Sequence, residues 1–126
     1  MSFSNTDETT VLQWTFTNGA VTRPTAWYLA LFTSDPTDAG TGTEIVGNGY
    51  TRKAVTFSVT GDTATNTGAV EFDAATASWG TVTHVGVFDA STSGNLIAHS
   101  ALTTSKAVSA GDILRGPAGD LDITLD

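Results

Sequence analysis

WYLALF, from Trp27 to Phe32, is the stretch that decides the fold. Its six residues are all apolar, as in a central strand that is covered on both faces. The run ends in the turn signal SDPTDAG, Ser34 to Gly40, and a loop rich in Gly and Thr continues to Gly49. The chain also holds 24 Thr, a β-branched residue that favours strands. The composition therefore agrees with a fold built mainly of strands.

Short segments with strand patterns follow at regular intervals. Apolar and polar residues alternate over residues 53–59, 70–73 and 121–125. Residues 82–88 and 95–102 indicate a hairpin with a six-residue loop. Turns are expected at residues 61–68 and 107–111. The sequence predicts a mainly β fold, a single β-sandwich or partly closed barrel of about 7–8 short antiparallel strands.

The N-terminal segment allows two interpretations. Asn5 begins a capping-box pattern, and Leu12 and Phe16 are i,i+4 neighbours, which favours a short helix over residues 5–17. Leu12, Trp14 and Phe16 also alternate with polar residues, as they would in a strand. We favour the helix.

The length of 126 residues is that of one domain with one core. Residues 1–10 are expected to form a flexible N-terminal arm, and residues 11–126 a single β-sandwich domain. The chain has no Cys, so packing without disulfides must hold the fold. The first residues lack the basic and apolar regions of a signal peptide.

The charge of the chain argues against nucleic acid and membranes as partners. Thirteen acids and five bases give a formal net charge of −8, and the bases are spread along the chain. Binding to phosphate backbones or to an anionic membrane surface needs a basic footprint. In addition, no apolar run approaches the roughly 20 residues that span a bilayer.

Candidate chemical sites are few. His84 and His99 fall on the two strands of the predicted hairpin and could bind a metal or share a proton, but no third ligand has natural spacing. Asp35, Asp38 and Glu44 could form an oxygen cage for calcium, but their spacing is typical of turns. No nucleophile elbow or phosphate-binding loop is present. The sequence predicts no catalytic, cofactor or metal site, and no enzyme.

Surface contacts are the remaining route to function. Exposed aromatic rings could stack on sugars or anchor a protein interface. Trp79 fits the core and an interface equally well, whereas the arm and the 35–49 loop are expected to be exposed. The candidate interface residues are Phe3, Trp14, Asp35, Asp38, Glu44, Tyr50 and Trp79.

Several runs resemble a family of small virion proteins of tailed bacteriophages. These runs are Trp27 to Gly40, Gly42-Thr43-Glu44, Gly49 to Arg52, Val55-Thr56-Phe57, Trp79 to Ala90, Gly94-Asn95-Leu96 and, more weakly, Ala118 to Leu125. Members of that family are often labelled tail-fibre-like, and similar small β-proteins serve as capsid cement or decoration proteins. The resemblance also implies a helix for the N-terminal segment.

The resemblance implies a structural virion protein that is assembled in the host cytoplasm. Our first expectation is a capsid cement protein that stabilises the head by bridging capsomers, with the major capsid protein as partner. A homo-oligomer is expected, and a trimer is favoured because decoration proteins are usually symmetric. The alternative is a tail-fibre or baseplate-associated component with a structural or receptor-binding role.

Overall fold

The structure is a computed structural model, and it describes residues 1–125. Within them it has one α-helix and ten strands in three antiparallel sheets, without a closed barrel. The elements are β1 (Ser2–Phe3), α1 (Asn5–Phe16), β2 (Trp27–Phe32), β3 (Lys53–Val55), β4 (Phe57–Thr60), β5 (Thr63–Asn66), β6 (Val70–Glu71), β7 (Gly80–Phe88), β8 (Leu96–Val108), β9 (Arg115–Gly116) and β10 (Asp122–Thr124). The predicted mainly β, sandwich-like fold with an N-terminal helix is confirmed.

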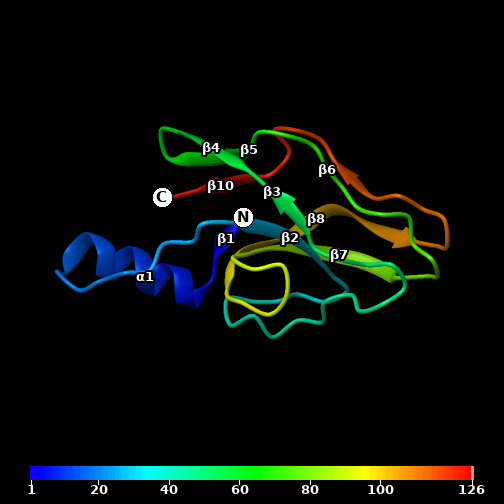
Figure 1. Cartoon of the computed structure of the whole chain (residues 1–126), viewed down its shortest axis with the longest axis horizontal. Helices are drawn as coiled ribbons and strands as arrows, with labels where there is room; N and C mark the ends of the chain where they lie inside the picture. Colours follow the sequence, from blue (N-terminus) through cyan, green and yellow to red (C-terminus); the bar gives the residue numbers. More distant parts are fainter. Residues whose placement is uncertain (126) are drawn as a thin grey trace.

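The strands form two layers (Figure 1). One layer is the five-stranded sheet with the order β1-β8-β7-β2-β3, and the other holds the sheets β10-β5-β4 and β6-β9. The apolar run Trp27–Phe32 is β2, which pairs with β7 on one side and with β3 on the other. Leu29 and Leu31 are 3% and 1% exposed, so the run lies in the core as predicted.

The predicted hairpin is also present, and its second strand is longer than expected. β7 and β8 pair from Gly80↔Val108 to Phe88↔Leu96, with register shifts at two points. β8 continues through Ala107 and Val108, where we had predicted a turn. On its other side β8 pairs only with the two residues of β1. Most of β8 therefore has one free edge within the part of the chain that the structure describes.

Two predictions for the middle of the chain were wrong. The single strand expected over residues 53–59 is interrupted at Thr56, which lets β3 join one layer and β4 the other. The turn expected over residues 61–68 contains β5, which is paired on both sides, by β4 and β10. β5 has the sequence TATN and buries no large apolar side chain, so it carries no hydrophobic alternation. Its pairing is instead supported by side-chain hydrogen bonds, such as Thr65 Oγ1 to Asp122 Oδ1 at 2.6 Å.

The N-terminal residues are attached to the five-stranded sheet. Ser2 and Phe3 pair with His99 and Ala98, so the first part of the predicted arm forms β1 and the rest lies in α1. The helix cap is Ser4 and not Asn5, because the Ser4 side chain accepts a hydrogen bond from the Asp7 N–H. No helix of residues 1–125 has the length and apolar character needed to cross a membrane.

Replacing a central core residue tests this architecture. Leu31→Ala removes a fully buried side chain, and we expect the free energy of unfolding to fall by about 2–5 kcal/mol. The control Val46→Ala shortens a side chain that is 86% exposed and should change stability by less than about 0.5 kcal/mol. Urea denaturation measures both, and equal effects of the two substitutions would contradict the fold.

Candidate interaction surfaces

Three of the predicted interface residues lie in an internal polar and aromatic cluster, namely Glu44, Tyr50 and Trp79. The Arg52 guanidinium donates two hydrogen bonds of 2.8 Å to the Glu44 carboxylate. The Tyr50 hydroxyl donates to the same carboxylate at 2.6 Å and accepts from the Leu31 N–H at 3.0 Å. The Arg52 and Glu44 side chains are 7% and 23% exposed. Glu44 and Tyr50 are thus engaged inside the monomer, and Glu44 has Arg52 as its cation.

The same cluster fixes the hairpin loop. Arg52 Nη1 donates to the carbonyl oxygens of Ala90 and Ser93 at 3.0 and 2.7 Å, and the guanidinium lies 3.7 Å from the centre of the Phe88 ring. Burial lowers the pKa of Arg52, but the hydrogen bonds and charge of Glu44 outweigh burial and raise it overall. Arg52 therefore stays charged and holds the Glu44 loop against the hairpin loop.

Trp79 belongs to the core, so the structure decides between its two interpretations. The residue is 5% exposed, and its indole N–H donates to the Asn48 carbonyl oxygen at 2.8 Å. Its ring meets the Tyr50 ring edge-on at 5.6 Å, and Tyr50 stacks on Phe72. With this exposure Trp79 presents very little surface to a partner.

The Tyr50 contacts predict a change in stability at alkaline pH. Burial, followed by the hydrogen bond to Glu44, raises the pKa of Tyr50 above its usual value of about 10. The unfolded chain releases the Tyr50 proton above about pH 10 while the folded chain keeps it, so the free energy of unfolding falls as the pH rises further. We expect Tyr50→Phe to lower stability by about 1–3 kcal/mol at pH 7 and to make this alkaline decline shallower. Urea denaturation from pH 7 to alkaline values measures both, and equal slopes in the two proteins would contradict the assignment.

Asp35 and Asp38 lie next to the two histidines. Asp38 Oδ1 is 2.7 Å from His99 Nε2, and the two oxygens of Asp35 lie 3.8 Å from His99 Nδ1 and 3.9 Å from His84 Nε2. The predicted neighbouring strands thus do bring the histidines to one place, but sequence spacing did not reveal their carboxylate partners. In residues 1–125, no three His, Asp or Glu side chains are placed so that they could hold a metal ion. The contacts between these two carboxylates and the two histidines attach the loop after β2 to the β7–β8 hairpin.

The loop over residues 35–49 has many internal hydrogen bonds. The Thr41 and Thr43 N–H groups donate to Pro36 O and Ser34 Oγ at 2.6 and 2.8 Å. A Cβ atom on Gly42 would lie 2.6 Å from the Pro36 backbone, so only glycine fits there. These hydrogen bonds fix the backbone of the loop, and its exposed side chains project from that fixed backbone.

Helix α1 carries three large apolar side chains that are exposed. Leu12, Trp14 and Phe16 are 57%, 69% and 78% exposed, and the helix has no buried residue. Figure 1 shows α1 projecting from one end of the molecule. Phe3, in contrast, packs against the core from β1. Of the predicted interface aromatics, Trp14 is the one that the structure leaves open to a partner.

The base of α1 is held firmly although its far end is not covered. The Ser4 N–H donates to Ile97 O at 2.8 Å, and the Asn5 N–H donates to Asp38 O at 2.9 Å. The Ser4 hydroxyl, which is buried, donates to Leu96 O. The direction of the helix is thus set by β8 and by the loop after β2, while its last two turns carry apolar side chains outside the core.

Comparison with protein-family models matches residues 2–124 to the family described as Podophage GP4 fiber I protein gp80. The chain belongs to this family. The match includes α1 as well as both layers of strands, so the projecting helix lies within the GP4 fiber I region. The tailed-phage virion family expected from the sequence is confirmed, and the tail-fibre alternative fits the GP4 fiber I description better than capsid cement does. No curated protein matches the chain.

Trp14 is among the surface residues expected from the sequence, whereas Leu12 and Phe16 are not. The i,i+4 spacing of Leu12 and Phe16 indicates a helix, and an apolar stripe on a helix usually faces a core. The sequence of the helix does not show that the two layers of strands already close the core without it. Only the three-dimensional arrangement shows that the stripe has no cover within the monomer.

Proposed function

We propose that this chain is a structural subunit of a phage fibre or of a neighbouring tail component, with no catalytic activity, and that it works through protein contacts made by the end of α1. The observation that carries this proposal is the exposure of Leu12, Trp14 and Phe16 on a helix whose base is fixed. Aromatic side chains at such positions are the usual anchors of protein interfaces. The family match supports a place in the virion fibre.

The proposal includes a homo-oligomer, with a trimer favoured. A small subunit gains contact area by repeated copies arranged around an axis. The net charge of −8 would keep free copies soluble before assembly. The capsid cement function, with the major capsid protein as partner, is the second candidate, and it differs from the first in how many copies a virion holds.

The double substitution Trp14→Ala/Phe16→Ala tests the role of α1. Neither side chain is buried, so the isolated protein should keep its thermal midpoint within a few degrees. We expect the variant to be lost from purified virions, because the anchors of the contact are gone. Quantitative gel densitometry of particles from complemented phage measures the copies of this chain against the major capsid protein.

The control is Val59→Ala, which changes an apolar side chain that is 74% exposed but lies on β4. This variant should be incorporated like the wild type. A wild-type stoichiometry of a few copies per particle supports the fibre or tail component. Hundreds of copies would instead support capsid cement, and normal incorporation of the α1 variant would exclude the helix as the contact.

A further inference from the structure

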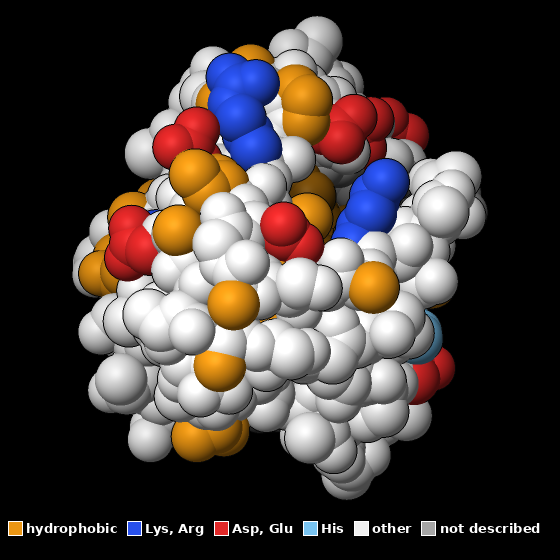
Figure 2. Space-filling model, turned by 90° about the vertical axis from the view of Figure 1, so that its right-hand side faces the viewer, with side chains coloured by type: hydrophobic (Ala, Val, Ile, Leu, Met, Phe, Trp, Pro, Cys, Tyr) orange, Lys and Arg blue, Asp and Glu red, His pale blue; other side chains and the backbone are white. Residues whose placement is uncertain are grey.

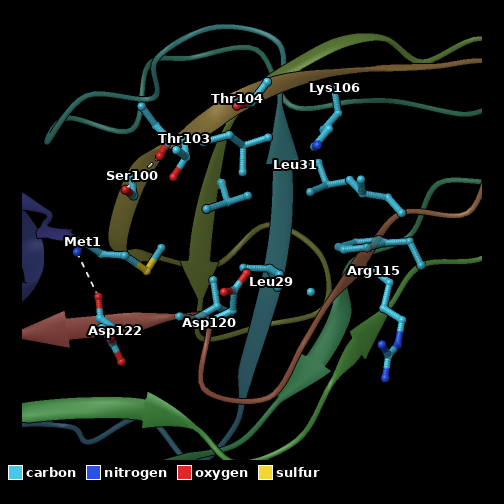
Figure 3. A pocket seen from close by; sticks show the side chains of 17 residues that line it. Met1, Leu29, Leu31, Ser100, Thr103, Thr104, Lys106, Arg115, Asp120 and Asp122 are labelled. Carbon is cyan, nitrogen blue, oxygen red and sulfur yellow. Dashed lines mark hydrogen bonds between the residues drawn. The ribbon is translucent and has the colours of Figure 1, made fainter.

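A groove lined by both apolar and polar groups opens between the two layers along the free edge of β8. Its volume is about 410 Å³, within the range of pockets that bind small molecules. Leu29, Leu31 and Val85 form part of its floor, and segments next to β9 and β10 form the wall opposite β8 (Figure 3). These floor residues are at most 6% exposed, so the apolar surface that the groove offers comes mainly from partly buried side chains on its walls, those of Met1, Leu102, Leu114 and Leu121.

The two ends of the groove differ in charge. At one end the Met1 amino group donates to the Asp122 carbonyl oxygen at 2.9 Å, whereas Lys106 and Arg115 lie at the other end (Figure 3). Lys106 forms no ion pair within residues 1–125, and Arg115 reaches Glu71 only at 3.8 Å. In a chain of net charge −8 these two bases form a distinct positive end.

Figure 2 views the molecule from the side away from α1. Lys and Arg side chains stand there among acidic and apolar groups, and the surface is hollowed between them. An occupant of the groove should therefore offer apolar side chains for the walls and a negative charge for the basic end.

Helix α1 carries this combination along one stripe. Glu8, Leu12 and Phe16 follow one another at i, i+4 and i+8 and so lie on the same face. A rise of about 1.5 Å per residue places Glu8 about 12 Å from Phe16 along the axis. Glu8 is exposed and forms no ion pair within residues 1–125. The stripe thus pairs one free carboxylate with two uncovered apolar side chains.

We propose that the Glu8–Leu12–Phe16 stripe of one copy docks into the groove of a second copy, with Glu8 facing Lys106 and Arg115. This inference rests on the proposed role of α1 as a contact surface and names its partner. The stripe and the basic end of the groove lie toward opposite ends of one molecule, so the contact runs head to tail between copies. Each copy offers one helix and one groove, and such a contact closes into a ring when the rotation between copies allows it.

The contact is small and is repeated around the assembly. Aromatic residues bury about 150–250 Å² each, so Phe16 supplies most of the apolar area from the helix side and Leu12 adds to it. Trp14 follows Leu12 by two positions and so lies on the other side of the helix, outside the contact. With an equal area from the groove the total stays below about 1,200 Å², the size of weak and transient interfaces. In a closed ring every copy makes this contact twice, once with its helix and once with its groove.

Two variants, each defective in one half of the contact, test the inference. Leu12→Ser/Phe16→Ser removes the helix anchors, and Lys106→Glu/Arg115→Glu reverses the charge at the groove. All four side chains are exposed, so both proteins should fold like the wild type, which thermal unfolding checks. Analytical ultracentrifugation of the full chain should show an oligomer for the wild type and dissociation constants at least about tenfold higher for each variant alone.

Mixing the two variants is the decisive step. The helix variant keeps an intact groove and the groove variant keeps an intact helix, so the mixture should form a heterodimer that grows no further. Adding Glu8→Lys to the groove variant should restore oligomers, because the charges are then exchanged. The control Val59→Ser lies on β4, outside both surfaces, and should leave the oligomer unchanged.

Several results would overturn the inference. These are a monomeric wild type, oligomers that persist in either variant, and a mixture that fails to associate. Loss of association in the helix variant without recovery on mixing would mean that helices pair with each other. If Trp14→Ala/Phe16→Ala is lost from virions while the oligomer in solution is unaffected, the proposed function stands and the helix binds another virion protein.

Discussion

The structure depends on how the outer edge of β2 satisfies its backbone hydrogen bonds. β3 pairs with β2 only as far as Leu29, yet the core continues to Phe32. Buried N–H and C=O groups without partners are costly, so other groups must take the place of a strand. The Tyr50 hydroxyl accepts from the Leu31 N–H, and the Ile45 N–H donates to the Leu31 carbonyl oxygen at 3.1 Å. One phenol and a short piece of loop thus complete the sheet.

This requirement explains the polar cluster around Glu44. The Tyr50 hydroxyl can accept a hydrogen bond from the Leu31 N–H only if its own O–H points elsewhere. Glu44 orients the hydroxyl by accepting a hydrogen bond from it. Arg52 then neutralises Glu44 and reaches the hairpin loop. Two residues that stood out in the sequence as exposed loop groups are therefore internal supports, and their chemistry serves folding.

The sequence could predict the elements whose hydrophobic pattern is complete within a few residues. The β2 run, the β7–β8 hairpin and the N-terminal helix were all predictable on that basis. β5 was not, because its stability comes from two neighbouring strands and from threonine hydrogen bonds. The carboxylate partners of His84 and His99 were also missed, since they lie far away in the sequence and meet the histidines only through the fold. The exposure of the candidate surface residues was hard to predict for the same reason, because it depends on which side chains the rest of the folded chain covers.

The projecting end of α1 contributes almost nothing to the interior. Selection for a stable fold and selection for a contact made by this helix therefore act on different residues. Substitutions at Leu12, Trp14 and Phe16 leave the core, the caps and the sheet pairings intact. If α1 makes the contact proposed above, their effect falls on that contact alone. A lineage could then alter what this helix binds in steps that each leave a folded protein, while Ser4 and its hydrogen bonds keep the helix pointing in the same direction. The same separation makes the helix a convenient place to engineer new contacts, because stability need not be rebuilt after each change.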